Sequence, residues 1–219
     1  MFGSSLDSSL LLDSIYQTLY MVTVSLVLGA LIGIPLGILL VITRKNGIWE
    51  NVIIYYLLNP IINIFRSLPF IILLIAIVPF TKLIVGTSIG TSAAIVPLTV
   101  YVAPYIARLV ENSLLEVNSG VIEAAHSMGA SPIQIIRYFL LPEALGSLIL
   151  ALTTSIIGLI GATAMAGAVG GGGIGDLALA YGYQRFDTIV IVITVIILVI
   201  MVQVIQSLGN VLSRLVRRS

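Results

Sequence analysis

One polar stretch in an otherwise apolar chain has the residue types and spacing of a specific interaction site. The segment Glu123-Ala-Ala-His-Ser-Met-Gly129 is followed, twelve residues later, by Leu141-Pro142, on the longest charged loop between hydrophobic runs. Ala124 and Ala125 keep one face flat, and Glu123 adds a negative charge, so the segment suits insertion into a groove of a partner protein. The alternative is a plain amphipathic helix lying on the membrane surface.

Residues for bond-making chemistry are scarce. The chain has no cysteine and one histidine, His126, which disfavours thiolate chemistry, a histidine metal site or a catalytic triad. Gly170–Gly175 matches GxGxxG in form, but no strand precedes it in a βαβ unit and no acidic residue follows at the required spacing. Without a GKS or GKT sequence there is no Walker A motif, so any energy from ATP must come from a partner.

The polar loop predicts two short helices around a glycine turn. Asn118 and the following residues favour a helix as far as Met128, and Gly129 suits a left-handed stop. Ser131-Pro132-Ile133-Gln134 is typical of a capping box with proline at the first helical position. We expect a helix-turn-helix over about residues 118–142.

The second of these helices has an apolar face in the predicted register. Ile133, Ile136 and Leu140 fall on one side of it. We expect Leu141-Pro142 to end this helix and lead back toward the membrane.

The composition predicts that this chain lies within a lipid bilayer. It is 59% hydrophobic and 9% charged, whereas soluble domains carry about 25% charged residues. Each hydrophobic run is long enough for one crossing helix of about 20 residues. The runs are 14–43, 51–81 with Arg66 inside it, 83–107, 144–175 and 188–213. The fold class predicted is an all-α integral membrane protein with five transmembrane helices.

The basic residues predict an orientation by the positive-inside rule. One side collects seven of them, which are Arg44, Lys45, Arg108, Arg137, Arg214, Arg217 and Arg218, against Lys82 and Arg185 on the other. We therefore expect the N-terminus outside and the C-terminus and the Glu123 loop in the cytoplasm. Arg66 is the one basic residue left at apparent membrane depth.

The chain predicts one membrane domain with short ends. The start lacks a basic n-region and carries Asp7 and Asp13, so we expect the first apolar segment to be retained as a span. The expected organisation is an extracytoplasmic segment 1–13, an integral membrane domain 14–213 and a basic cytoplasmic end 214–219. A net charge of +1 indicates no nucleic-acid partner.

Two features inside the spans suggest helix packing and bending. Gly29, Gly33 and Gly37 form a small-residue groove, which favours close packing of a neighbouring helix within one subunit, with a dimer contact as the alternative. Arg66 and Pro69 predict a broken second span, because proline removes a helix hydrogen bond and a charge at depth faces protein or water. We expect Arg66 to bind helix-end carbonyls rather than substrate.

Met165 precedes the glycine-rich loop, in the sequence Thr163-Ala-Met-Ala-Gly167. A single methionine in a span is usually core filling. A large flexible side chain among alanines and glycines also suits the plug of a narrow pathway.

These residues together resemble the methionine ABC importer permeases, the MetI-type transmembrane subunits. The polar loop resembles the EAA loop of ABC importer permeases in general. The stretches 63–73, 85–90 with 93–99, and 167–176 with 181–183 are similar to the methionine branch in particular. The resemblance covers about Asp13 to the C-terminus. Phe139 departs from it, standing where a β-branched residue is common.

The resemblance implies the type I ABC importer permease fold and a role in methionine uptake across the bacterial inner membrane. It implies that Glu123, Ala124, Ala125, Gly129, Leu141 and Pro142 couple to an ATPase, and that Met165 closes the pathway. It also implies a homodimer, two cytoplasmic ATPase subunits that bind ATP–Mg, and an external methionine-binding lipoprotein. No cofactor in this chain is expected.

Two alternatives remain at this stage. The first is the same architecture carrying another amino acid or small solute. The second is a secondary transporter that needs no ATPase, which commonly shows inverted repeats and several ionisable groups within the membrane. The sequence shows no repeat.

Overall fold

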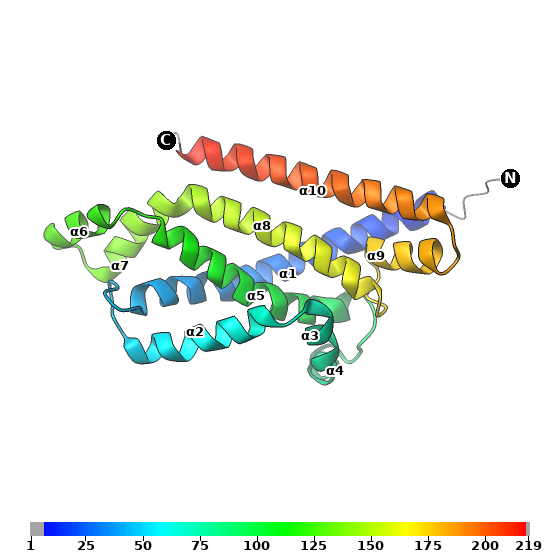
Figure 1. Cartoon of the computed structure of the whole chain (residues 1–219), viewed down its shortest axis with the longest axis horizontal. Coiled ribbons are helices and arrows are strands. Elements are labelled where there is room, and N and C mark those ends of the chain that lie inside the picture. Colours follow the sequence, from blue (N-terminus) through cyan, green and yellow to red (C-terminus); the bar gives the residue numbers. More distant parts are fainter. Residues whose placement is uncertain (1–6, 218–219) are drawn as a thin grey trace.

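The computed structural model describes residues 7–217, which fold into helices joined by short turns, with no strand among them. Figure 1 shows the long helices side by side along the longest axis of the molecule. The elements in chain order are α1 (Ser8–Thr43), α2 (Val52–Ser67), α3 (Phe70–Ala76), α4 (Val78–Val85), α5 (Thr91–Leu115), α6 (Ser119–Ser127), α7 (Pro132–Ile135), the π-helix η1 (Ile136–Leu140), α8 (Leu141–Gly167), α9 (Gly173–Leu177), the π-helix η2 (Ala178–Tyr183) and α10 (Thr188–Arg217).

The long helices account for the predicted membrane spans. Four stretches in the described part of the chain are long and apolar enough to cross a bilayer, namely Ser8–Thr43, Thr91–Leu115, Pro132–Gly167 and Thr188–Arg217. α2 and α3 together form a fifth candidate, bent by 104° at their junction. The all-α class and the five-span prediction are confirmed, with the second span broken.

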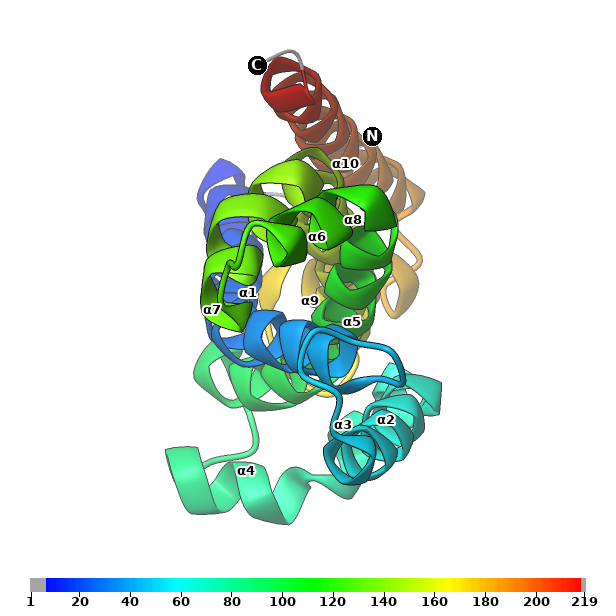
Figure 2. The ribbon, with the colours of Figure 1, turned by 90° about the vertical axis from the view of Figure 1, so that its left-hand side faces the viewer.

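The helices surround α5 and α8 unevenly. α1 packs most extensively on α5 and also contacts α8, while α2 packs on α5 and α10 packs on α8. Figure 2 shows α10 and α2 on opposite sides of the α5–α8 pair, with α1 to one side of it. One broad face of the α5–α8 pair is therefore covered by α1, and the opposite face is not covered within the subunit.

Glycines on α1 allow this helix to pack closely against α5. A Cβ on Gly33 would lie 2.5 Å from the Ala103 carbonyl oxygen, and one on Gly37 would lie 2.5 Å from the Ala107 carbonyl oxygen. A Cβ on Gly29 would overlap the Val102 side chain. The small-residue groove predicted from the sequence is thus used for packing within one subunit.

The second span breaks where Arg66 and Pro69 predicted. The carbonyl groups that end α2 are bound by its own neighbours, because Ser67 Oγ donates to Ile64 O (2.8 Å) and Leu68 N–H donates to Phe65 O (3.4 Å). Arg66 is exposed and has no hydrogen bond to any residue that the structure describes. The expected carbonyl clamp by Arg66 is therefore not present within the subunit.

The glycine-rich loop after α8 is closely packed against α1. Gly173 N–H donates to Gln17 Oε1 (2.8 Å), and Ile174 N–H donates to Thr18 Oγ1 (2.9 Å). A Cβ on Gly175 would overlap the backbone of Ala164, so this helix start can approach α8 only as glycine. The loop fixes the end of α8, where Met165 lies.

We predict opposite effects on stability from alanine at two helical glycines. Gly33→Ala should lower the free energy of unfolding by about 1–3 kcal/mol, because its Cβ meets a backbone carbonyl that cannot move aside. Gly161→Ala should be neutral or raise it by up to about 1 kcal/mol, because nothing lies within 4 Å of its Cβ position and alanine favours the helix. Thermal unfolding of the purified permease measures both, and equal effects would contradict the α1–α5 contact.

Candidate functional site

The polar loop forms the helix-turn-helix that its sequence predicts. Asn118 Oδ1 accepts the Gly120 N–H (2.8 Å) at the start of α6. At its end, Gly129 N–H donates to His126 O (2.9 Å) and Ala130 N–H donates to Ala125 O (3.1 Å), which is the Schellman pattern. Gly129 has a φ of 79°, a left-handed conformation that favours glycine. These bonds give the turn one defined shape.

The helix that follows does not stop at Leu141-Pro142, contrary to our expectation. Gln134 Oε1 accepts the Ser131 N–H (2.8 Å) at the start of α7, and the chain then runs through η1 into α8 without a loop. A proline ring in an α-helix clashes with the carbonyl four residues earlier. The wider π-turn of residues 136–140 lies just before Pro142 and makes room for its ring. One helix therefore links the polar loop to the membrane.

The same π-turn shifts the apolar face of this helix. Ile135 and Leu140 are fully buried, whereas Ile133, which the sequence placed on the inner face, is 75% exposed. Met128, at the end of α6, is also exposed. The loop thus exposes two large apolar side chains, Met128, whose exposure was not predicted, and Ile133, which was predicted to face inward.

Glu123 has no ion pair or side-chain hydrogen bond within the part of the chain that the structure describes. It is exposed, as is Ala124, while Ala125 next to it is fully buried and anchors α6. Glu123 and His126 line a cleft of about 220 Å³ whose other wall is the turn after α1, including Arg44.

The uncovered face of the α5–α8 pair carries polar residues at membrane depth. On α5, the rings of Tyr101 and Tyr105 stack with their centroids 6.3 Å apart, on the side away from α1. On α8, Thr154 and Gly161 are exposed at helical spacing. The flanking helix α10 adds Gln203, which lies beside Gly161. We call this surface the polar face.

A four-residue network ties α2 to α5 at one edge of the polar face. Arg108 pairs with Glu111 on α5 and donates from Nη2 to Asn59 Oδ1 and Asn63 Oδ1 on α2, at 2.7 Å each. These charges are the reason that the hydrophobic run of the sequence ends at Ala107. Their pairing lets α5 continue to Leu115, so Arg66 is not the only ionisable residue within the spans.

Met165 lies on the polar face and not in the core. Its side chain is 51% exposed, whereas Met21 of α1 is completely buried. It follows Thr154 and Gly161 along the same side of α8, near the end fixed by the glycine-rich loop. Core filling therefore does not explain this methionine.

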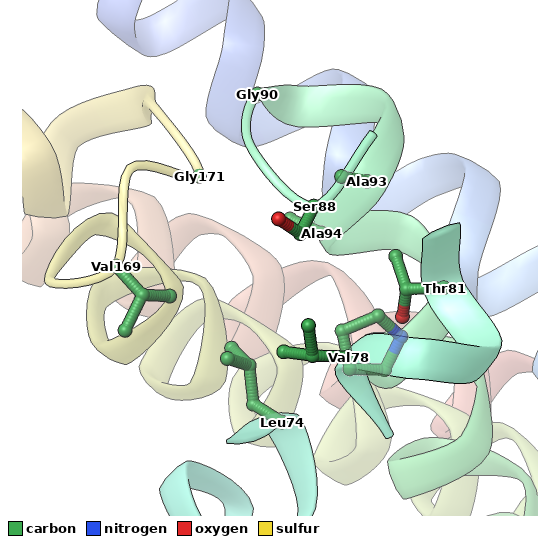
Figure 3. Close-up of a pocket in the computed structure, with 10 residues that line it drawn as sticks. Leu74, Val78, Thr81, Ser88, Gly90, Ala93, Ala94, Val169 and Gly171 are labelled. Carbon is green, nitrogen blue, oxygen red and sulfur yellow. The ribbon is translucent and has the colours of Figure 1, made fainter. Parts of the chain in front are cut away.

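A small cavity lies where three segments meet beside the end of α8. Figure 3 shows Leu74, Val78 and Thr81 from α3 and α4 opposite Val169 and Gly171 of the loop after α8, with residues of the α5 start beside them. Gly90 N–H donates to Gly170 O (2.8 Å) and joins two of these segments. The cavity holds about 20 Å³, which is space for one water molecule. It is a packing junction rather than a ligand site.

Known proteins resemble this chain over nearly its full length. The family of binding-protein-dependent transport system inner membrane components matches residues 29–219. The probable D-methionine transport system permease protein MetI of Vibrio cholerae is 51% identical over 212 residues, which are 97% of this chain and 94% of that protein. The corresponding Escherichia coli protein is 54% identical over 158 residues, or 72% and 73% of the two chains.

A solved structure has the same fold. A chain of the MetNI methionine ABC transporter, in an inward-facing conformation, superposes with a TM-score of 0.93 at 51% identity. The match covers 94% of this chain and 96% of that one. The helix order, the broken second span and the polar loop described above are thus features of a type I ABC importer permease.

Proposed function

The chain belongs to the family of binding-protein-dependent transport system inner membrane components, and from this premise we propose that it is the permease subunit of an ATP-driven methionine importer. The observation that carries the proposal is the 51% identity, over almost the whole chain, to a probable D-methionine permease. We further propose that it resides in the bacterial inner membrane with the N-terminus outside. The start of α1 and the end of α10 point in opposite directions along the long axis in Figure 1, which is consistent with an odd number of spans.

The polar face supports a pathway formed by two copies of the chain. Polar and ionisable residues inside a membrane face protein or a water-filled cavity, because lipid cannot solvate them. Here Tyr105, Arg108 and Gln203 fall on the face that α1 leaves uncovered. In the proposed homodimer these faces oppose each other, and an external methionine-binding lipoprotein delivers substrate between them.

The helix-turn-helix supports docking of a separate ATPase. Glu123, Ala124, Ala125 and Gly129 form the coupling element, with Leu141 and Pro142 where it enters the membrane helix. Glu123 offers an unpaired carboxylate, and Met128 and Ile133 offer apolar side chains. Two ATPase subunits, one on each coupling element, would bind ATP–Mg and hydrolyse it. This chain would make and break no bonds.

Uptake tests the substrate. Cells that express this chain with its ATPase and binding protein should accumulate labelled methionine, and cells that lack only this chain should not. Unlabelled methionine-like compounds should compete, while acidic and basic amino acids should not. Unchanged methionine uptake without the chain would remove the substrate assignment and leave the importer architecture standing.

Charge reversal tests the coupling element. Glu123→Arg should lower uptake at least about tenfold, because like charges brought together at an interface cost several kcal/mol. The purified variant should keep its thermal unfolding temperature, since Glu123 has no intramolecular partner among the described residues. Asp13→Arg reverses a charge near the start of α1, at the end of that helix away from the polar loop. It is the matched control and should leave co-purification of the ATPase intact. Normal uptake by Glu123→Arg would refute the docking role.

Removal of a side chain tests the gate. Met165→Gly should let methionine leak from loaded proteoliposomes without ATP, because the neighbouring side chains of Ala164 and Ala166 are too small to close the pathway. Met165→Leu keeps the bulk and should remain tight. A tight Met165→Gly variant would place the barrier elsewhere.

A further inference from the structure

A groove between α8 and α10 lies on the polar face beside Met165. Its volume is about 390 Å³, within the range of small-molecule sites. The walls on α8 include Ile157, Gly161 and Ala164, and those on α10 include Val199 and Val202. Gly161 and Ala164 precede Met165 along the helix, so the groove lies on the cytoplasmic side of the proposed gate.

Gln203 is the polar residue of this groove. It lies near the middle of α10, is exposed, and has no side-chain hydrogen bond to a described residue. Its neighbour Gln206 differs, because Gln206 Nε2 donates to Asn210 Oδ1 (3.1 Å) and does not line the groove. An amide left unpaired at the centre of a span is costly unless water or a ligand reaches it.

Gly161 keeps the groove open. No atom lies within 4 Å of its Cβ position, although α8 packs against α5, α10, α9 and α1. Its neighbour Gly158 lies instead against the ring of Tyr105. The absence of a side chain at residue 161 therefore leaves the groove beside α8 open. It is not required for the packing of α8 against α5.

We propose that this groove is a transit subsite for the apolar side chain of the amino acid that has passed Met165, with the Gln203 amide binding its charged backbone groups. The inference rests on the proposed function and adds the residues that recognise the cargo inside the membrane. Branched aliphatic walls suit a flexible thioether chain, and a side-chain amide can donate to a carboxylate and accept from an ammonium group. A single neutral partner binds weakly, as a transit site requires.

The test uses proteoliposomes that contain the permease, the ATPase and the binding protein. Gly161→Leu should fill the groove and lower uptake of labelled methionine by about ten- to a hundredfold, because its side chain takes the space proposed for the apolar side chain of the cargo. Gln203→Leu should lower it by about three- to tenfold, the worth of one hydrogen bond. Stimulation of ATP hydrolysis by the binding protein should persist in both, and Gln206→Leu should transport normally.

A labelling experiment detects the ligand directly. Because the chain has no cysteine, Gln203→Cys introduces one thiol into the permease. Saturating L-methionine should slow its reaction with a water-soluble maleimide in the nucleotide-free complex, while L-aspartate should not. Gln206→Cys is the matched control, and its labelling rate should not respond to methionine.

The outcomes separate this proposal from the one on which it rests. Absence of methionine uptake by the wild-type complex would overturn the substrate assignment. Normal wild-type uptake together with normal uptake by Gly161→Leu, or with unprotected Gln203→Cys, would overturn the subsite alone. A disulfide that joins two copies of the Gln203→Cys variant would show that a second copy fills the groove, which also overturns it.

Discussion

The close packing of α1 on α5 is the contact on which the other helices depend. In a bilayer, lipid tails are as apolar as the side chains, so helices associate by close contact and hydrogen bonding rather than by burial from water. Gly33 and Gly37 supply that contact because they let α1 reach the backbone carbonyls of α5. Leu98 and Val102 of α5 are fully buried in the core that also contains Leu159 of α8. α8 is thereby placed relative to α1 as well.

Because α1 covers only one face of the α5–α8 pair, no helix of the subunit covers the opposite face. The uncovered side carries tyrosines, amides and an ion pair at depths where lipid offers no hydrogen bonds. The outer surface of α10, by contrast, presents apolar side chains such as Leu208 and Leu212. The distribution of polar groups alone thus distinguishes the lipid side from the side that needs water or a second copy. It also explains why Arg108 is fixed to α2, since a neutralised network is cheaper there than a free charge.

Local features could be predicted because each depends on a few adjacent residues. Asn118, Gly129 and the Ser131–Gln134 pair have the predicted roles in the helix-turn-helix. Pro69 correctly marked the broken span, although the helix-end carbonyls are bound by Ser67 and Leu68 rather than by Arg66. Each of these depends on short-range hydrogen bonding that composition and spacing reveal.

Features that depend on a second segment could not be predicted. The end of α5 was misplaced because Arg108 pairs with Glu111 and also donates hydrogen bonds to Asn59 and Asn63 of α2, which charge counting along one run does not detect. Gln203 is one polar residue within the apolar run of α10, and only the position of α8 shows that it lies in a groove. Ile133 was wrongly placed on the same face as Leu140, because the π-turn that ends at Leu140 changes the phase between the two residues.

That π-turn also determines how the two proposed working ends are connected. The helix from Pro132 to Gly167 starts directly after the turn that follows α6, where the proposed coupling residues Glu123 to Gly129 lie, and it carries Met165 near its other end with no loop inside it. At 1.5 Å per residue, about 50 Å of hydrogen-bonded backbone separates these ends. Displacement of a rigid helix end moves the whole helix, whereas a loop would absorb it. The one irregular turn, residues 136–140, lies at the membrane entrance, beside Pro142. Bending will concentrate there, because irregular turns and proline lack the regular bonds that stiffen the rest. The membrane part from Pro142 to Met165 should then move as one body with the groove that Gly161 keeps open.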